Sequence, residues 1–225
     1  MHLQDNIQAK VDNLRQHLLE LLSTKAQSLS LPKDKKVTLS KLVTRLNQPL
    51  SEPISAPVNT PVKRQALSHN PLDDLIKPIS ASSKTLPKEC AVIINSLTAL
   101  AEALPWYQRQ VARNPAFMDG HVNAQIIGPE GLEVRQDVIV GVTLMRENLP
   151  YPDHKHEPEE LYLVLSDGRW RQENGPWHTP GLGGLVHNKS GVMHGMKSQT
   201  QPFIALWCLP LDKPFKSFSA PLSDT

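Results

Sequence analysis

The first 105 residues of this 225-residue chain contain no aromatic side chain and no glycine. The eleven aromatic residues lie between Trp106 and Phe218, and the eleven glycines lie between Gly120 and Gly195. A β-sheet uses aromatic and β-branched residues on its pleated faces and glycine in its tight turns. We therefore expect no sheet in the N-terminal part and place any sheet after residue 105.

Cysteine is scarce as well. The two cysteines, Cys90 and Cys208, lie far apart in the chain and form no CxxC pair. This spacing argues against a zinc knuckle and against a framework of disulfides. Both residues are therefore interpreted as small, buried apolar groups.

Long apolar runs and dense basic runs are also missing. No stretch approaches the roughly 18 to 20 apolar residues that span a bilayer, and the opening segment MHLQDNIQAK lacks the apolar core of a secretory signal. The net charge is only +2, and basic stretches such as Lys33 to Lys36 are short. We therefore expect a cytoplasmic protein whose partners include neither a membrane nor a nucleic acid.

The N-terminal part contains helical patterns. A helix is predicted over residues 3–24, where apolar residues recur at spacings of three and four, namely Leu3, Ile7, Val11, Leu14, Leu18 and Leu21. Such a narrow stripe must be buried, either against the rest of the chain or against a second copy, so a homodimer is one expected assembly. A second helix is predicted over residues 39–46, after Ser and Thr capping residues.

A proline-rich segment follows these helices. Seven prolines lie between residues 49 and 87 among Ser, Thr, Asn and Lys. This composition buries too little apolar surface to offset the ordering entropy, so residues 49–88 are interpreted as a largely extended linker, in which residues 71–79 could dock locally. A further helix is predicted from Glu89 and is ended by Pro105.

The C-terminal part has the pattern of a β-barrel. Short apolar stretches alternate with turn residues between Leu132 and Cys208, and no helix of three or more turns fits between them. Regularly spaced short strands predict an antiparallel sandwich or barrel rather than a βαβ fold. The expected organisation is an N-terminal helical region (1–48), a linker (49–88), and a helix followed by a β-barrel (89–225).

Histidine placement is the sharpest chemical signal in the sequence. Residues two apart on a strand face the same side, so His154 and His156 can aim at one point. Glu160 can approach that point after a bend at Pro158, and a later strand can add His194. Three imidazoles and a carboxylate form a ligand set for a divalent metal such as iron, manganese, zinc or nickel. Two further histidines, His178 and His187, are interpreted as loop or rim residues.

The wider pattern resembles the two cupin motifs. The first comprises Gly141, His154, His156, Glu160 and Gly168, and the second comprises Gly184, Ser190, Gly191 and His194. The run before His154 is longer than usual, Lys189 replaces a usual proline, and Ser198 replaces a usual asparagine. The resemblance implies a mainly β fold: a C-terminal cupin, which is a double-stranded β-helix or jelly-roll barrel, behind an N-terminal α-helical extension.

A closer resemblance lies in YPDHKHEPEELYLVLSDGRW, SGVMHGM and PFIALWC. These segments resemble the cupin-type dimethylsulfoniopropionate lyases over roughly residues 100–212. The family's reaction is β-elimination of a sulfonium carboxylate to dimethyl sulfide and acrylate. The resemblance implies four metal ligands and two active-site tyrosines, which are His154, His156, Glu160 and His194, and Tyr151 and Tyr162.

These residues are suited to that reaction. A metal that binds the substrate carboxylate would stabilise the charge that develops when the α-proton leaves. Tyr162 projects toward the ligand face and is the expected base, while Tyr151 is expected to bind metal or substrate, and the assignment of the base between them stays open. The sulfonium group favours aromatic faces, and the candidates for its site are Tyr107, Trp170 and Trp207, with Trp177 as a further aromatic residue.

The fold alone leaves other functions open, because cupins carry many activities. One alternative is a metal-dependent dioxygenase or isomerase that acts on another small carboxylate. Another is a non-enzymatic barrel that binds a small molecule. All three interpretations share a divalent metal or small-molecule site inside the barrel.

Overall fold

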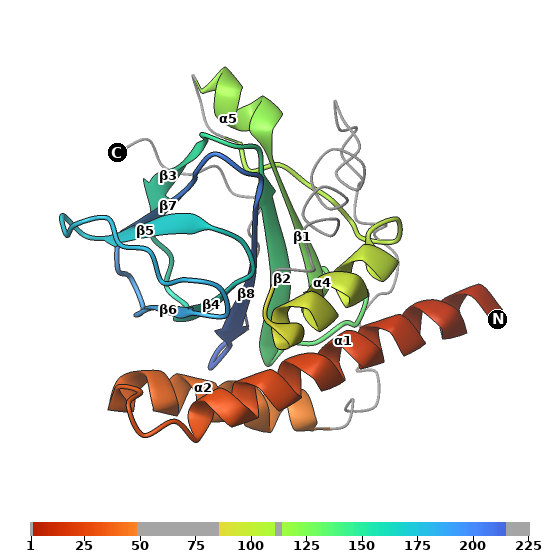
Figure 1. The fold of residues 1–225 in the computed structure, drawn as a ribbon. Coiled ribbons are helices and arrows are strands. Elements are labelled where there is room, and N and C mark those ends of the chain that lie inside the picture. The colour runs from red at the N-terminus through yellow and green to blue at the C-terminus, as the bar shows by residue number, and fades with distance from the viewer. Residues whose placement is uncertain (1, 49–85, 111–113, 215–225) are drawn as a thin grey trace.

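The computed structural model describes residues 2–48, 86–110 and 114–214. Its eight described strands form two antiparallel sheets (Figure 1). The larger sheet has the order β1-β2-β8-β4-β6, and the smaller has the order β3-β7-β5. The strands are β1 His121–Ile127, β2 Val138–Met145, β3 Pro150–His154, β4 Glu160–Val164, β5 Gly168–Gln172, β6 Leu185–Asn188, β7 His194–Ser198 and β8 Phe203–Pro210. The predicted mainly β fold with helices before the barrel is confirmed.

The described helices are α1 His2–Ala26, α2 Lys33–Asn47, α4 Lys88–Leu100 and α5 Pro115–Gly120. α1 packs against α2 and α4, and α2 packs against β2 and β8. The apolar stripe of α1 is fully buried at Val11, Leu14 and Leu18. Of the two partners considered for this stripe, the structure therefore places it against the rest of the same chain. The homodimer stays a prediction.

Three helices differ in their bounds from the expected ones. α1 extends slightly beyond residues 3–24 at both ends. α2 begins at Lys33, after Pro32, and is therefore longer than the predicted helix over residues 39–46. Its first turn is polar, so the apolar spacing that predicted the helix did not include that turn. α4 ends at Leu100 rather than at Pro105, and the buried indole of Trp106 donates a hydrogen bond to the carbonyl of Ala101 at 2.8 Å.

The short helix α5 was not predicted from the sequence. Pro115 stands in its first turn, and the side chain of Asn114 accepts a hydrogen bond from the Phe117 amide at 3.1 Å. Both are ordinary signals for a helix start. The helix is only six residues long, so it carries no apolar period that would reveal it.

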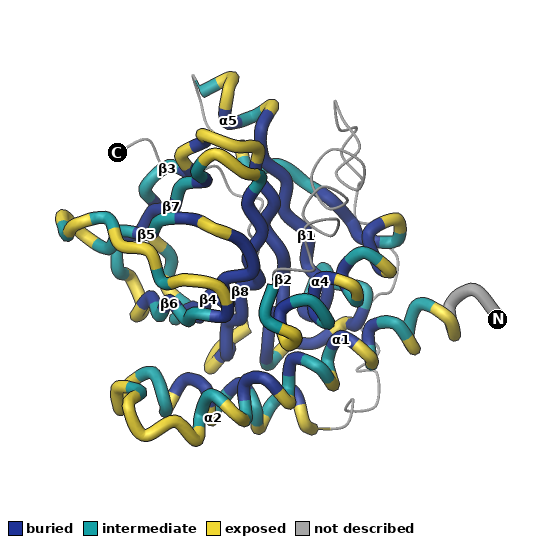
Figure 2. The backbone as a smooth tube through the Cα atoms, viewed as in Figure 1, coloured by how far each residue is buried: buried dark blue, intermediate teal, exposed yellow. Residues whose placement is uncertain are grey.

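Two apolar clusters lie on opposite faces of the larger sheet. One joins this sheet to α1, α2 and α4, and the other lies between the two sheets. Along β4, Leu161 and Leu163 belong to the cluster under the helices, whereas Tyr162 and Val164 belong to the cluster inside the barrel. The strands β1, β2, β4 and β8 are buried along their full lengths (Figure 2). This alternation directs Tyr162 into the barrel.

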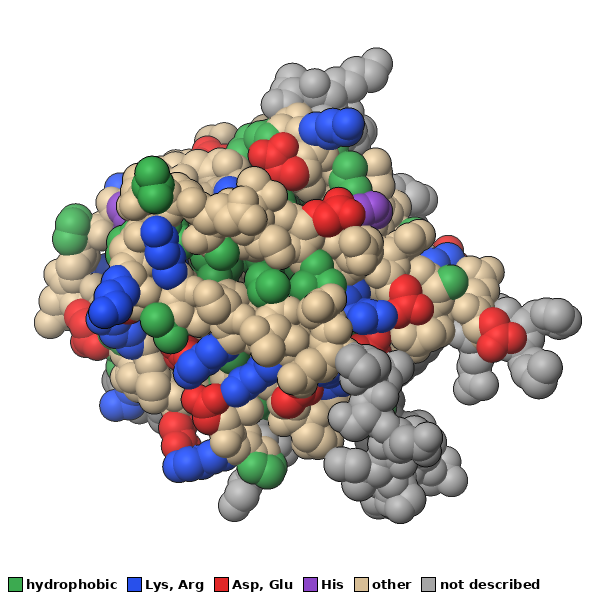
Figure 3. Space-filling view, turned by 90° about the horizontal axis from the view of Figure 1, so that it is seen from below, with side chains coloured by type: hydrophobic (Ala, Val, Ile, Leu, Met, Phe, Trp, Pro, Cys, Tyr) green, Lys and Arg blue, Asp and Glu red, His purple; other side chains and the backbone are tan. Residues whose placement is uncertain are grey.

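The two cysteines are buried, as expected from the sequence. In the face shown in Figure 3, positive and negative side chains lie interspersed. Cys90 and Cys208 are buried and free. Among the described residues no helix is long and apolar enough to cross a membrane. Most of the predicted linker, including residues 71–79, lies outside the described residues.

Candidate metal centre

Two antiparallel strands bring the predicted histidines together. His154 ends β3, His194 begins β7, and the two residues are direct partners in the strand register. His156 lies in the turn after β3. The ring centroids of His154 and His194 are 4.3 Å apart, and those of His156 and His194 are 5.1 Å apart. Ligand atoms of all three lie within 4.8 Å of one another, so this group could hold a metal ion.

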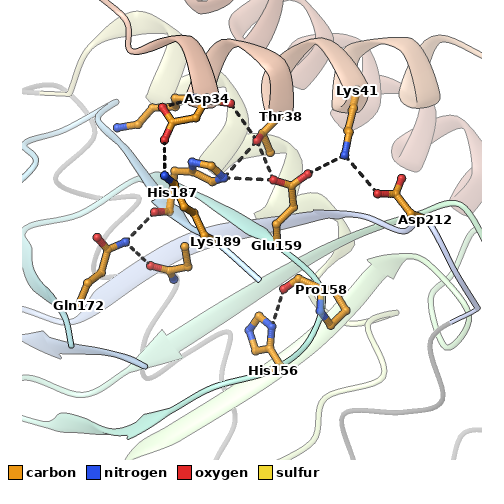
Figure 4. A network of polar contacts seen from close by, with 12 residues as sticks. Asp34, Thr38, Lys41, His156, Pro158, Glu159, Gln172, His187, Lys189 and Asp212 are labelled. Carbon is orange, nitrogen blue, oxygen red and sulfur yellow. Dashed lines mark hydrogen bonds and ion pairs between the residues drawn. The ribbon is translucent and has the colours of Figure 1, made fainter. Parts of the chain in front are cut away.

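Each imidazole is oriented by a backbone carbonyl two residues away in the chain. The Nδ1 atoms of His154 and His194 lie 2.9 Å from the carbonyl oxygens of Pro152 and Val192, respectively. The Nδ1 atom of His156 lies 2.8 Å from the carbonyl oxygen of Pro158 (Figure 4). A carbonyl only accepts hydrogen bonds, so each Nδ1 carries the proton and donates it. The Nε2 atoms are thereby left to bind a proton or a metal.

Glu160 approaches the imidazoles from the other sheet. Its Oε2 atom lies 3.4 Å from His156 Nε2 and 3.2 Å from His194 Nε2. The carboxylate is 3% exposed. Burial acts to raise the pKa of Glu160, but the adjacent His156 and His194 outweigh it and hold this pKa well below its usual range. Burial acts to lower the pKa of His156, but Glu160 outweighs it and raises this pKa.

The donor set fits a divalent metal. His194 Nε2 is buried and makes no hydrogen bond of suitable geometry, although it faces Glu160. Burial and the neighbouring His194 hold the pKa of His154 well below its usual range, so His154 is neutral and its Nε2 offers a lone pair. Three imidazole nitrogens suit a divalent transition metal. The three histidines could therefore hold such an ion.

A small cavity adjoins the imidazoles. Its volume is about 20 Å³, enough for roughly one water molecule. It is lined by Tyr107, Arg109, Asn123, Thr143, Tyr151, His154, His156, Glu160, Tyr162 and Trp207. Because the cavity is this small, a larger ligand requires side chains to move aside.

The cavity lining contains four of the five aromatic residues predicted for the site. Tyr107, Tyr151, Tyr162 and Trp207 all face it. Trp170 is instead packed in the core, with its ring centroid 5.3 Å from that of Phe203 and 6.5 Å from that of Tyr162.

The other aromatic and histidine candidates lie away from the cavity. Trp177 is held between two cations, the Arg171 guanidinium at 4.8 Å and the Lys197 ammonium at 4.6 Å from the ring centroid. His178 is exposed, as expected for a rim residue. His187 was also expected in a loop or at the rim, and that interpretation is wrong. It lies on β6 with its side chain only 5% exposed, next to α2 and away from the cavity.

Three residues of the lining were missed by the sequence interpretation. Asn123 and Thr143 are polar positions within the apolar strands β1 and β2, and Thr143 Oγ1 donates to Asn123 Oδ1 at 2.6 Å. Their alternation with apolar neighbours was an available signal. Arg109 lies in a segment without periodicity, where no pattern indicated it. Its backbone amide donates to His121 Nε2 at 3.0 Å, and its side chain reaches Tyr151.

The tyrosine hydroxyls have different surroundings. Burial raises the pKa of Tyr151, although hydrogen bonds to Asn123 and Arg109 act in the opposite direction. Burial raises the pKa of Tyr162 much further, and the charge of Glu160 adds to the effect. In the metal-free site both phenols are therefore protonated.

The first glycine of the pattern has a packing role beside the cavity. Gly141 on β2 is the direct register partner of Trp207 on β8. A Cβ atom at position 141 would lie 2.1 Å from the Trp207 ring. Glycine therefore lets the indole lie across β2 and reach the cavity wall.

Comparison with protein families agrees with this geometry. A family model described as dimethylsulfoniopropionate lyase matches residues 34–205. The chain belongs to the dimethylsulfoniopropionate lyase family. The match includes all four predicted ligands and both predicted active-site tyrosines, and it also includes most of α2.

Two curated proteins are similar to part of this chain. Dimethylsulfoniopropionate lyase DddQ of Ruegeria pomeroyi is 32% identical over 91 residues, which are 40% of this chain and 45% of DddQ. A putative dimethylsulfoniopropionate lyase, DddL of Cereibacter sphaeroides, is 28% identical over 100 residues, which are 44% of this chain and 42% of DddL. The chain thus spans somewhat less than half the length of the curated relatives it matches.

Solved structures of lyases share the fold of this family member. The crystal structure of DddQ from Ruegeria pomeroyi DSS-3 has a TM-score of 0.52 and 26% identity, over 60% of this chain and 72% of that chain. A second crystal structure, described as dimethylsulfoniopropionate lyases RdDddP and RnDddQII, has a TM-score of 0.63 over 94% of this chain and 99% of that chain. Its identity is 18%, so this second likeness concerns the fold alone.

Proposed function

We propose that this chain cleaves dimethylsulfoniopropionate to dimethyl sulfide and acrylate as a carbon-sulfur lyase. The observation that carries the proposal is that Tyr162 and Glu160 line one cavity with His154 and His156, the two imidazoles that are grouped with His194. Family membership supports the same reaction. The reaction is a β-elimination: a base takes the proton on the α-carbon, its electron pair forms the C=C bond, and the C–S bond breaks as neutral sulfide leaves.

We assign the divalent metal to His154, His156, His194 and Glu160, with iron, manganese, zinc or nickel as the candidate ions. Bound there, the ion would act as a Lewis acid toward the substrate carboxylate. The three Nδ1 hydrogen bonds support this assignment because they fix the imidazole planes before a metal arrives.

Tyr162 is the proposed base. Its side chain is 3% exposed and hydrogen bonds with Glu160. Burial and the Glu160 charge raise its pKa in the metal-free site, so the phenol keeps its proton there. Neutralisation of Glu160 by a bound cation removes that opposing charge and favours the phenolate. The metal-free protein should therefore be inactive for two reasons: poor substrate binding and a protonated Tyr162.

The remaining lining residues are assigned to the two ends of the substrate. Tyr151 and Arg109 adjoin each other and offer a hydroxyl and a guanidinium to the carboxylate. Trp207 and Tyr107 offer aromatic faces to the sulfonium group. Trp170 stays a predicted substrate residue, and its place beside Tyr162 suits support of that ring more than direct contact.

The direct test is release of dimethyl sulfide. Purified protein loaded with manganese, iron, zinc or nickel is incubated with dimethylsulfoniopropionate, and headspace dimethyl sulfide and acrylate are measured against metal-only blanks. We expect both products in equal amounts from at least one metal form. Release no greater than in the blanks would refute the lyase assignment and favour the dioxygenase, isomerase or binding-protein alternatives.

Replacement of the proposed base gives a sharper prediction. Tyr162→Phe should lower kcat by about 100-fold to 10,000-fold, because general bases contribute effects of that size. Metal content, measured by elemental analysis, should stay unchanged. Tyr107→Phe is the matched control: it removes a hydroxyl from the same cavity and should keep kcat within about tenfold. An active Tyr162→Phe variant would remove Tyr162 as the base and direct attention to Tyr151.

A further inference from the structure

A chain of side-chain amides ends on the carboxylate of Glu160. Asn188 on β6 lies directly opposite Glu160 on β4 in the strand register. Its Nδ2 atom is 3.2 Å from Glu160 Oε2, the same oxygen that faces His156 and His194. Gln172 at the end of β5 lies 2.6 Å from Asn188 Oδ1 through its Nε2 atom. Asn188 is 1% exposed, so water does not replace these contacts.

The donor and acceptor roles in this series of hydrogen bonds are fixed at the Gln172 end. Gln172 Nε2 also donates to the backbone carbonyl of His187 at 2.6 Å (Figure 4). A carbonyl cannot donate, so the nitrogen end of Gln172 must face it. Asn188 must then present its oxygen to Gln172 and its nitrogen to Glu160. The orientation of each amide therefore follows from a single backbone acceptor.

The hydrogen bond between the two amides also joins the two sheets beside the proposed metal site. Gln172 is the register partner of His194 in the smaller sheet, and Asn188 is the register partner of Glu160 in the larger sheet. One amide pair thus connects β5, the neighbour of the strand that carries His194, with β6, the neighbour of the strand that carries Glu160. Neither amide lines the cavity described above, so neither is placed to contact a reacting atom.

We propose that Asn188, oriented by Gln172, is a positioning residue that holds the Glu160 carboxylate in place, aimed at His156 and His194. This inference rests on the proposed metal site but not on the identity of the reaction. A donor that is fixed beforehand limits the rotation of the carboxylate, so less ordering is needed when the cation binds. Residues of this kind typically change metal affinity by about 10-fold to 100-fold.

A double-mutant cycle on metal affinity tests the proposal. The affinity of the metal-free protein for Co²⁺ and Zn²⁺ is measured by competition with a chromophoric chelator for four proteins: unsubstituted, Asn188→Leu, Glu160→Ala and the double variant. We expect Asn188→Leu to weaken binding by about tenfold when Glu160 is present and by less than about twofold in the Glu160→Ala background. The visible spectrum of the Co²⁺ form should change with Asn188→Leu only when Glu160 is present.

Equal losses in both backgrounds would show a merely structural role and overturn the proposal, as would an unchanged affinity in Asn188→Leu. If Asn188→Leu fails to fold, as judged by circular dichroism, Gln172→Met replaces it in the same cycle. That variant leaves the Asn188 contact but frees its orientation, and we expect a loss of about threefold that disappears without Glu160.

The two proposals fail in distinguishable ways. A protein that completes the cycle as expected but releases no dimethyl sulfide refutes only the lyase reaction. A protein that binds neither ion refutes the metal centre and the positioning role together.

Discussion

Two glutamates that are neighbours in the chain face opposite sides of the β4 and β6 strand pair. Glu160 faces the barrel interior, where it meets Asn188 and imidazole nitrogens. Glu159 faces α2, where Lys41 Nζ lies 3.0 Å from Oε1 and the Thr38 hydroxyl donates to Oε2 at 2.9 Å (Figure 4). His187 Nε2 lies 3.2 Å from the same Oε2 atom.

The side toward α2, here called the outer face, and the side toward the barrel interior, the inner face, each pair a glutamate with histidine. Only the inner face is suited to a metal. On the outer face, an ammonium group and a hydroxyl already satisfy Glu159. On the inner face, His194 Nε2 is buried without a suitable hydrogen bond, and the imidazoles converge from two sides. A metal site needs donors that remain unsatisfied in the folded protein, and the outer face lacks them.

The strongest test of this contrast removes one histidine from each face. His194→Ala should weaken metal binding by at least about 100-fold, because one of four proposed ligands is lost. His187→Ala, the matched control from the outer face, should leave the affinity within about twofold. Metal content after dialysis and chelator competition measure both. A similar loss of affinity in the two variants would mean that metal binding depends on both faces and would contradict the contrast between them.

A smaller effect is expected from the hydroxyl on α2. Thr38→Val keeps the shape of this buried residue but leaves Glu159 and His187 with one partner fewer. The free energy of unfolding should fall by about 1 kcal/mol, while metal affinity should not change. Thr38→Ser keeps the hydroxyl and controls for its loss. Chemical denaturation of the metal-free proteins gives the comparison, and a parallel fall in metal affinity would show that α2 also supports the inner face.

The inner face could be predicted in large part because its signals are local. The short spacing of His154 and His156 indicated that they meet, although only His154 lies on a strand, and the motif spacing added Glu160 and His194. The apolar stripe of α1 was equally clear. These predictions depend on which side of one strand or helix a residue occupies, and short sequence patterns contain that information.

The outer face and the amide chain could not be predicted in this way, because they depend on contacts between distant segments. Lys189, which stands where the general pattern has proline, forms an ion pair with Asp34 of α2 at 3.0 Å. Ser198, which stands where asparagine is usual, donates to the Arg146 carbonyl at 2.6 Å. The placement of His187 against α2 has the same origin. The helical extension thus explains Lys189 and the placement of His187, which the barrel motifs alone leave without a reason.

The smallest predicted effect is a pH dependence on the outer face. Burial acts to raise the pKa of Glu159, but hydrogen bonds from Lys41, Thr38 and His187 outweigh it and hold the pKa below its ordinary value of 4.5. A carboxyl with a lowered pKa in the folded state stabilises the protein above its unfolded pKa, and this contribution is lost as the pH falls through the folded pKa.

Glu159→Gln removes this contribution at every pH. Because the Glu159 side chain is 21% exposed and its partner Lys41 is 36% exposed, solvent screening should limit the cost to about 0.5 kcal/mol at pH 7. The difference in unfolding free energy from the unsubstituted protein should shrink steadily below pH 4.5, where Glu159 begins to take up a proton. A difference that stays constant down to pH 3 would mean that the charge of Glu159 does not contribute to the free energy of unfolding. Side-chain packing alone would then hold α2 in place.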